Sequence, residues 1–369
     1  MATANSRQPA HVFLAVSPAI QDPLWVTNLA GRSQDNHMNP SVLREKPVFI
    51  CGHPKAGTSL LRAILDAHPQ LIVYPEETIF FRRFFPRARS LDLSAQLKLA
   101  ETELIHIFQW NRQQPVASQK GYPDRDYSST PYDEVRDELY RLAGEEHRHP
   151  GDILSAAVLA YGLVNHQLSP QSTWWVEKSP YNEYFADQIF DWWPQARCIH
   201  IVRDPRDNFV SYQRKHPGWE AEFFSKNWLR STQAGVQNQR RFSPEKYMLL
   251  RYEDLTSSPQ ERINDLVSFL KIEWDDSLAE PTRAGEQWQG NSMFSNQFES
   301  ISSAPVARWK EKLDQSDAAV ISLMTRPIIE TLGYCTTAEI EMLSEKNHTA
   351  RWRAASWPVR RYFRKLQKK

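Results

Sequence analysis

The sequence predicts a three-layer α/β fold in which helices flank a central parallel sheet. Short apolar runs alternate along the chain with segments whose apolar residues recur at helical spacing. Strands that alternate with helices form parallel sheets with right-handed crossovers, because each helix packs back on the strands that it connects. One connection is much longer than the others, and its largely helical pattern adds a helical insertion, or lid, to the predicted fold.

Five apolar runs are expected to form the sheet, and helical patterns lie between them. The runs occupy residues 47–52, 71–74, 174–177, 197–202 and 247–251. The helical patterns occupy residues 58–67, 183–193, 206–240 and 259–270. The first run is continuously apolar, as is typical of a strand that is buried on both faces.

The remaining segments define the expected domain organisation. Residues 80–172 separate the second and third strands, and a structureless loop of that length is improbable, so we expect a helical lid. The lid belongs to a body that spans 46–335. Residues 1–45 are polar and are expected to form a weakly ordered arm. Residues 336–369 are expected to form a helical, basic tail that is solvated, with weak contact to a membrane surface or a polyanion as the alternative.

Composition excludes several classes of protein. The formal net charge is +1, so any anion must be bound by a local cluster, and no nucleic-acid partner is expected. The three cysteines are too few for a disulfide framework or a metal knuckle, which favours a reducing compartment. We recognise neither a membrane-spanning run nor a signal peptide, so a cytoplasmic location is expected. The sequence does not indicate the oligomeric state.

A phosphate-binding loop is predicted between the first strand and the first helix. The segment Gly52-His-Pro-Lys-Ala-Gly-Thr-Ser59 places backbone N–H groups at a helix N-terminus, which favours an anion. Its glycines match the nucleotide-binding pattern G-x-x-x-x-G-K-[ST], which makes the fold P-loop-like. However, Thr58 stands at the lysine position, the lysine is Lys55, and no obvious aspartate for Mg²⁺ follows. This loop suits a less charged 5′-group that is held without a metal.

A second anion site is predicted at the end of the fourth strand. Arg203 follows that strand, and Asp204 and Pro205 are a good helix start, so Arg203 should lie beside the first loop. Ser211 lies eight residues further on, in the helix. Two neighbouring phosphate sites suggest a nucleotide that is phosphorylated at both ends of its ribose. An ion pair of Arg203 with Asp207 or Glu177 is the structural alternative.

These segments resemble the sulfotransferases that use 3′-phosphoadenosine 5′-phosphosulfate (PAPS), over roughly residues 46–333. The order and spacing of the motifs carry the resemblance. The motifs are Pro54–Ser59, Glu177-Lys-Ser-Pro180, Arg203–Ser211, Arg251-Tyr-Glu-Asp-Leu255 and Ser302–Leu313. The resemblance implies PAPS as the co-substrate and no metal.

The resemblance also implies roles for single residues. The 5′-phosphosulfate would be bound by Lys55, Ala56, Gly57, Thr58 and Ser59. The 3′-phosphate would be bound by Arg203 and Ser211, with Tyr252 near the adenosine and Arg308 covering the nucleotide. The implied chemistry is in-line transfer of a sulfo group to an acceptor hydroxyl, with Lys55 and Lys178 stabilising the charge on the leaving oxygen.

The resemblance implies a glutamate as the general base that takes the proton of the acceptor hydroxyl. Sulfotransferases of phenols and steroids have a histidine two residues after the lysine that matches Lys178, but Pro180 stands there in this chain. Glu76 and Glu77, after the second strand, resemble instead the tyrosyl-protein and heparan-type branches, and Glu77 aligns best.

The sequence leaves alternatives open for the acceptor and for the class of reaction. Carbohydrate, lipid, small molecule and tyrosine all present hydroxyls, and the glutamate base and the arginines after it favour carbohydrate slightly. A P-loop kinase or NTPase, and a phosphoadenosine-binding module without catalysis, are the competing functions.

Overall fold

The computed structural model describes residues 40–288, 290 and 301–366 of the 369-residue chain. At its centre is a sheet of five strands, all parallel, in the order β2-β3-β1-β4-β5. The strands are β1 (Pro47–Cys51), β2 (Leu71–Val73), β3 (Trp174–Lys178), β4 (Arg197–Val202) and β5 (Tyr247–Arg251). The predicted parallel α/β sheet is therefore confirmed, and all five strands end at one edge, where ligands collect in such folds.

Helices cover both faces of the sheet, because successive residues of each buried strand point to opposite sides. Val48 and Ile50 pack with α2 (Thr58–Leu65) and α11 (Pro259–Leu270) on one face. Phe49 and Cys51 pack on the other face with α6 (Gly151–Val164) and α7 (Ala186–Trp192). The same face carries α9 (Ala221–Arg241), whose Gly235 lies against the ring of His200.

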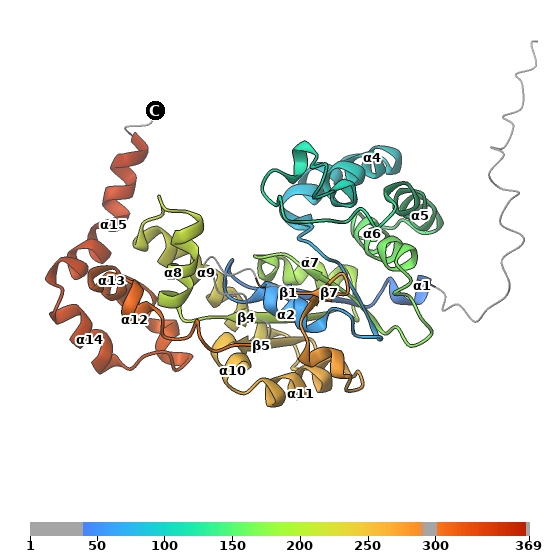
Figure 1. The fold of residues 1–369 in the computed structure, drawn as a ribbon. Helices are drawn as coiled ribbons and strands as arrows, with labels where there is room; N and C mark the ends of the chain where they lie inside the picture. Colours follow the sequence, from blue (N-terminus) through green and yellow to red (C-terminus); the bar gives the residue numbers. More distant parts are fainter. Residues whose placement is uncertain (1–39, 289, 291–300, 367–369) are drawn as a thin grey trace, which may run out of the picture. The chain divides into compact units, whose positions relative to one another are not determined.

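The segment expected to form a lid consists mainly of helices, several of which gather around α4, α5 and α6 in Figure 1. Its elements are the π-helical turn η1 (Phe80–Phe84), α3 (Phe85–Ala88), α4 (Leu93–Glu103), η2 (His106–Gln109), η3 (Ala117–Gln119), α5 (Tyr132–Glu145) and α6. Phe80, Phe81 and Phe84 are buried and stack with one another and with Trp192, so they form core rather than an acceptor groove.

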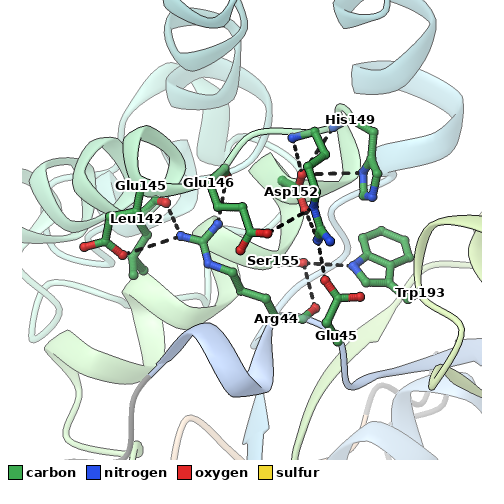
Figure 2. A network of polar contacts seen from close by, with 10 residues as sticks. Arg44, Glu45, Leu142, Glu145, Glu146, His149, Asp152, Ser155 and Trp193 are labelled. Atoms are coloured by element: carbon green, nitrogen blue, oxygen red, sulfur yellow. Dashed lines mark hydrogen bonds and ion pairs between the residues drawn. The ribbon is translucent and has the colours of Figure 1, made fainter.

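The beginning of the described chain is tied to the lid. Residues 40–43 form the short helix α1 (Pro40–Leu43), and Leu43 is fully buried. The Arg44 guanidinium donates to the carbonyl oxygens of Leu142 and Glu146, and its own carbonyl accepts from Ser155 (Figure 2). Residues 40–45 therefore pack on the body, while the rest of the expected arm lies outside the described residues.

The helix expected over 206–240 is two helices, and this expectation was wrong. Helix α8 (Pro205–Lys215) ends before Pro217 and Gly218, and α9 begins at Ala221. Proline clashes with the preceding turn and glycine lacks helix propensity, so the chain turns there. The segment expected as a helix over 183–193 begins as the 3₁₀ turn η4 (Asn182–Phe185) before α7.

The last elements form a helical layer around α8 and α9. They follow α10 (Tyr252–Ser257), η5 (Asp276–Ala279) and the ribbon of β6 (Thr282–Arg283) and β7 (Glu286–Gln287). The layer contains α12 (Trp309–Lys312), α13 (Gln315–Thr331), α14 (Thr337–Glu345) and α15 (His348–Leu366). Within α15, Arg353 pairs with Glu222 and Asp317, so part of the basic tail is bound to the body. Among the described residues we find no helix with the length and apolarity that crossing a bilayer demands.

Candidate active site

The loop between β1 and α2 has the backbone of an anion-binding loop. Three of its residues have left-handed φ values: Gly52 (133°), Lys55 (67°) and Gly57 (112°). A Cβ atom on Gly57 would lie 2.5 Å from Cδ2 of Tyr252, so only glycine fits there. No side chain in the described ranges caps α2, whose first N–H groups therefore face the loop.

Two side chains that the sequence analysis missed hold this loop in place. The Glu183 carboxylate accepts a hydrogen bond from the Gly52 N–H at 3.0 Å, and Asn208 donates to the Pro54 carbonyl at 2.9 Å. Both are buried. Burial raises the pKa of Glu183 to about 7, although a hydrogen bond from Ser231 opposes this. Because Glu183 lies 131 residues from Gly52, only the folded topology reveals the contact.

The cationic side chain of the loop belongs to Lys55. Burial lowers its pKa to about 8, and the positive charge of Lys215 adds to the effect. The Lys55 carbonyl accepts from Arg203 Nη1 at 3.4 Å, which joins this loop to the end of β4. The predicted loop residues 55–59 thus lie together at the carboxyl edge of the sheet.

Arg203 and Ser211 come together as predicted. Arg203 Nη1 lies 3.3 Å from Ser211 Oγ, and its guanidinium lies over the Tyr252 ring at 4.5 Å. Arg203 is only 5% exposed, and its Nε atom has no hydrogen-bond partner among the described residues. A buried guanidinium with an unused donor fits an anion such as a phosphate. Its hydrogen bonds do not go to Asp207 or Glu177, the structural alternatives.

The segment 301–309 crosses beside this second site. Asp207 accepts from the backbone N–H groups of Ala307 and Trp309, each at 2.7 Å, and Arg203 Nη2 donates to the Pro305 carbonyl at 2.9 Å. Arg308 lies in the same segment, and its charge acts on Tyr252. Arg308, which is predicted to cover the nucleotide, therefore lies near Tyr252, which is predicted to lie beside the adenosine. Asp207 was missed as the anchor of the segment.

The predicted acid–base residues form one connected group. Lys178 Nζ lies 2.6 Å from Glu77 Oε1 and 3.3 Å from the Ser59 hydroxyl. Lys178 is buried, whereas a third of the Glu77 side chain is exposed. Burial would raise the pKa of Glu77, but the charge and hydrogen bond of Lys178 outweigh it and lower that pKa. An ionised, partly exposed carboxylate therefore lies next to the phosphate loop.

Glu76 has a different environment from Glu77. It accepts from the Tyr127 hydroxyl at 2.8 Å and pairs with Arg125 at 3.1 Å, both of which belong to the lid segment. Its carboxylate is thus used to attach the lid. The two histidines nearest to the loop in the strands and turn, His53 and His200, are buried, so neither ring is exposed to an acceptor hydroxyl.

Among the residues that the structure describes, no three His, Cys, Asp or Glu side chains are grouped as metal ligands.

Comparison with known proteins identifies relatives of this chain. The family model described as "Sulfotransferase family" matches residues 47–276. Protein-tyrosine sulfotransferase A of Caenorhabditis elegans is 25% identical over 253 residues, which cover 67% of this chain and 54% of the relative. The protein-tyrosine sulfotransferase of Drosophila melanogaster is 23% identical, with 67% of this chain and 42% of the relative covered. The alignments thus span about half the length of these relatives.

The fold is also found in a solved structure. The sulfotransferase domain of the Synechococcus PCC 7002 olefin synthase aligns with a TM-score of 0.50 and 22% identity, covering 82% of this chain and 98% of that domain. This likeness concerns the arrangement of the sheet and its helices.

Proposed function

The chain belongs to the sulfotransferase family, and on that basis we propose that it transfers a sulfo group from PAPS to an acceptor hydroxyl. The observation that carries the proposal is the position of Lys178, which contacts Ser59 of the phosphate loop and Glu77 at once. One lysine thereby connects a donor site to a general base.

The two anion sites fit the two ends of PAPS. Residues 55–59 would hold the 5′-phosphosulfate on backbone N–H groups and the Lys55 ammonium. Arg203 and Ser211 would hold the 3′-phosphate, since their polar atoms are only 3.3 Å apart and Arg203 keeps an unused buried donor. The Tyr252 ring lies beside both sites and offers a face for adenine. PAPS supplies an activated sulfo group. The protein therefore needs to bind and align PAPS and the acceptor, and to take one proton from the acceptor hydroxyl.

In the proposed step, Glu77 takes the proton of the acceptor hydroxyl while that oxygen bonds to sulfur. The bond between sulfur and the 5′-phosphate oxygen breaks, and the electron pair remains on the phosphate. Lys178 and Lys55 stabilise this charge, because fixed cations in a poorly solvated site act strongly on developing charge. The low pKa of Glu77 keeps it ionised at neutral pH and thus able to accept the proton.

We propose carbohydrate as the first acceptor class to test, and phenols as the second. Tyr122 is partly exposed, and its pKa is raised by burial first and by the nearby charge of Glu77 second. Arg82 lies over the Tyr181 ring at 4.9 Å. Aromatic faces beside the base suit both sugars and phenols. The two relatives quoted are named as protein-tyrosine sulfotransferases, which supports including tyrosine.

Binding of 3′-phosphoadenosine 5′-phosphate (PAP) tests the donor site. We expect calorimetry in EDTA to show binding of PAP and much weaker binding of ADP. Arg203→Ala should abolish the preference for the 3′-phosphate. Arg214 is an exposed arginine of α8, and Arg214→Ala should leave this preference unchanged.

Transfer of label from [³⁵S]PAPS to lactose, 4-nitrophenol or tyrosine methyl ester then tests catalysis. Binding of ATP with magnesium but not of PAP would favour a kinase or NTPase instead, and PAP binding without transfer to any acceptor would favour a binding module.

A further inference from the structure

The Glu177 carboxylate is buried at the end of β3, and its hydrogen-bond donors within the described part of the chain are all uncharged. It accepts from the Thr78 hydroxyl at 2.7 Å, the Ser179 hydroxyl at 2.5 Å and the Asn182 side-chain amide at 2.7 Å. The Thr78 N–H adds a longer contact of 3.4 Å. Glu177 is 1% exposed. Burying a carboxylate without a cation is costly, so its hydrogen bonds must be kept.

The donors of this network surround the turn that carries Glu77. Thr78 is the residue after Glu77, and the Ser179 hydroxyl, which donates to Glu177, also accepts from the Ile79 N–H at 2.9 Å. The Thr78 hydroxyl in turn accepts from the Phe80 N–H at 3.2 Å. A single carboxylate therefore organises three consecutive residues that lie about 100 positions away in the sequence.

The turn is strained, which explains why it needs such support. Ile79 has φ 50° and ψ 30°, a left-handed conformation that a β-branched residue rarely adopts. Strain of this kind persists only where the surroundings hold it. Directly after it the chain enters the π-helical turn η1. Two residues before Ile79, the Glu77 carboxylate contacts Lys178. Lys178 follows Glu177 in β3, so the two side chains leave the strand on opposite faces.

We propose that Glu177 is a positioning residue that locks the strained turn at Thr78 and Ile79 and thereby holds the Glu77 carboxylate against Lys178. The inference rests on the proposed function, because it assigns the purpose of the network to the alignment of the base. Loss of the lock misplaces the base, and a displacement of about 1 Å in a reacting group can reduce the rate about 100-fold.

Substitutions at Thr78 test the lock without removing the buried carboxylate. Thr78→Val keeps the shape but removes the hydroxyl, whereas Thr78→Ser restores it. Thr325→Val is the matched control, because the hydroxyl of the buried Thr325 bonds, among the described residues, only to the carbonyl of Ile321 in its own helix. We expect Thr78→Val to lower kcat for [³⁵S]PAPS transfer at least 10-fold, with the Kd of PAP changed less than 2-fold. Thr78→Ser and Thr325→Val should retain wild-type kcat.

Two further readouts separate positioning from general stability. In a Glu77→Gln background, Thr78→Val should reduce kcat by less than 2-fold, because the base that it positions is gone. Hydrogen exchange of the amides of Ile79 and Phe80 should accelerate in Thr78→Val and not in Thr78→Ser. An undiminished kcat in Thr78→Val, additive losses with Glu77→Gln, or a parallel loss of PAP binding would each overturn the proposal. If the wild type neither binds PAP nor transfers label, the proposed function is wrong, and the exchange comparison alone decides whether the lock exists.

Discussion

Lys178 Nζ lies 2.6 Å from Glu77 Oε1, although two other glutamates, Glu177 and Glu183, are much nearer to Lys178 in sequence. The contact joins the loop after β2 to the end of β3, so it depends on the sheet order that places these strands side by side. It makes Lys178 the link between the proposed base and the loop that precedes α2.

Replacing the base should separate catalysis from donor binding. We expect Glu77→Gln to lower kcat by about 10²–10⁴-fold, the usual contribution of a positioned general base, while the Kd of PAP stays within a few-fold. Glu76→Gln is the matched control, because its amide oxygen can still accept from Tyr127. Initial rates of transfer from [³⁵S]PAPS give kcat for both variants. A larger loss in Glu76→Gln than in Glu77→Gln would reassign the base.

Donor binding should weaken as the pH rises through about 8. Burial, aided by Lys215, lowers the pKa of Lys55 to about 8, so the ammonium is protonated below that pH and becomes a neutral amine above it. The contribution of Lys55 to the affinity for PAP should therefore be lost as the pH rises above 8. Lys55→Arg should remove this pH dependence, since a guanidinium stays charged. Calorimetry from pH 6.5 to 9.5 measures the effect, and an identical pH profile in both proteins would exclude Lys55 as its source.

Gly57→Ala should damage the phosphate loop. The new Cβ would lie 2.5 Å from Cδ2 of Tyr252, and φ of 112° is unfavourable for alanine. We expect a loss of about 1–3 kcal/mol in the free energy of unfolding and at least a 10-fold weaker binding of PAP. Gly121→Ala is the control, because nothing lies within 4 Å of the added Cβ. Urea denaturation measures the free energy of unfolding, and calorimetry measures the binding of PAP. Unaltered PAP binding in Gly57→Ala would show that PAP binding does not need this loop conformation.

The sheet could be predicted from the sequence because its strands are buried on both faces and read as continuous apolar runs. The positions of the loop at 52–59 and of Arg203 were predictable for a related reason, since both directly follow such runs. The break between α8 and α9 was missed because aromatic residues continue the helical pattern on both sides, and it is the local chemistry of Pro217 and Gly218 that ends the helix.

The supporting carboxylates could not be predicted in the same way. Glu177 and Glu183 appear in the sequence as ordinary acids beside Lys178, and Glu177 entered the sequence analysis as an alternative partner of Arg203. In the structure they accept hydrogen bonds from Thr78 and Gly52, which lie 99 and 131 residues away. Such contacts follow from the order of strands in the sheet. This order cannot be deduced from the composition or from the spacing of residues.

The environment of Glu183 predicts how stability depends on pH. Burial raises the pKa of Glu183 to about 7 in the folded protein, against 4.5 for the ordinary value. Between these values the folded state binds more protons than the unfolded state, so this group makes the free energy of unfolding fall as the pH rises from about 4.5 to 7. The slope approaches about 1.4 kcal/mol per pH unit for one group.

Glu183→Gln should remove this contribution. The amide resembles the protonated carboxyl group, because its oxygen can accept from Gly52 and its N–H can donate to the Ser231 hydroxyl. Urea denaturation of both proteins at pH 5, 6, 7 and 8 measures the difference. We expect the variant to gain stability relative to the wild type from pH 5 to 7 and the difference to level off above pH 7. A difference that does not change with pH would mean that Glu183 is ionised throughout, with the Gly52 N–H and the Ser231 hydroxyl compensating its burial.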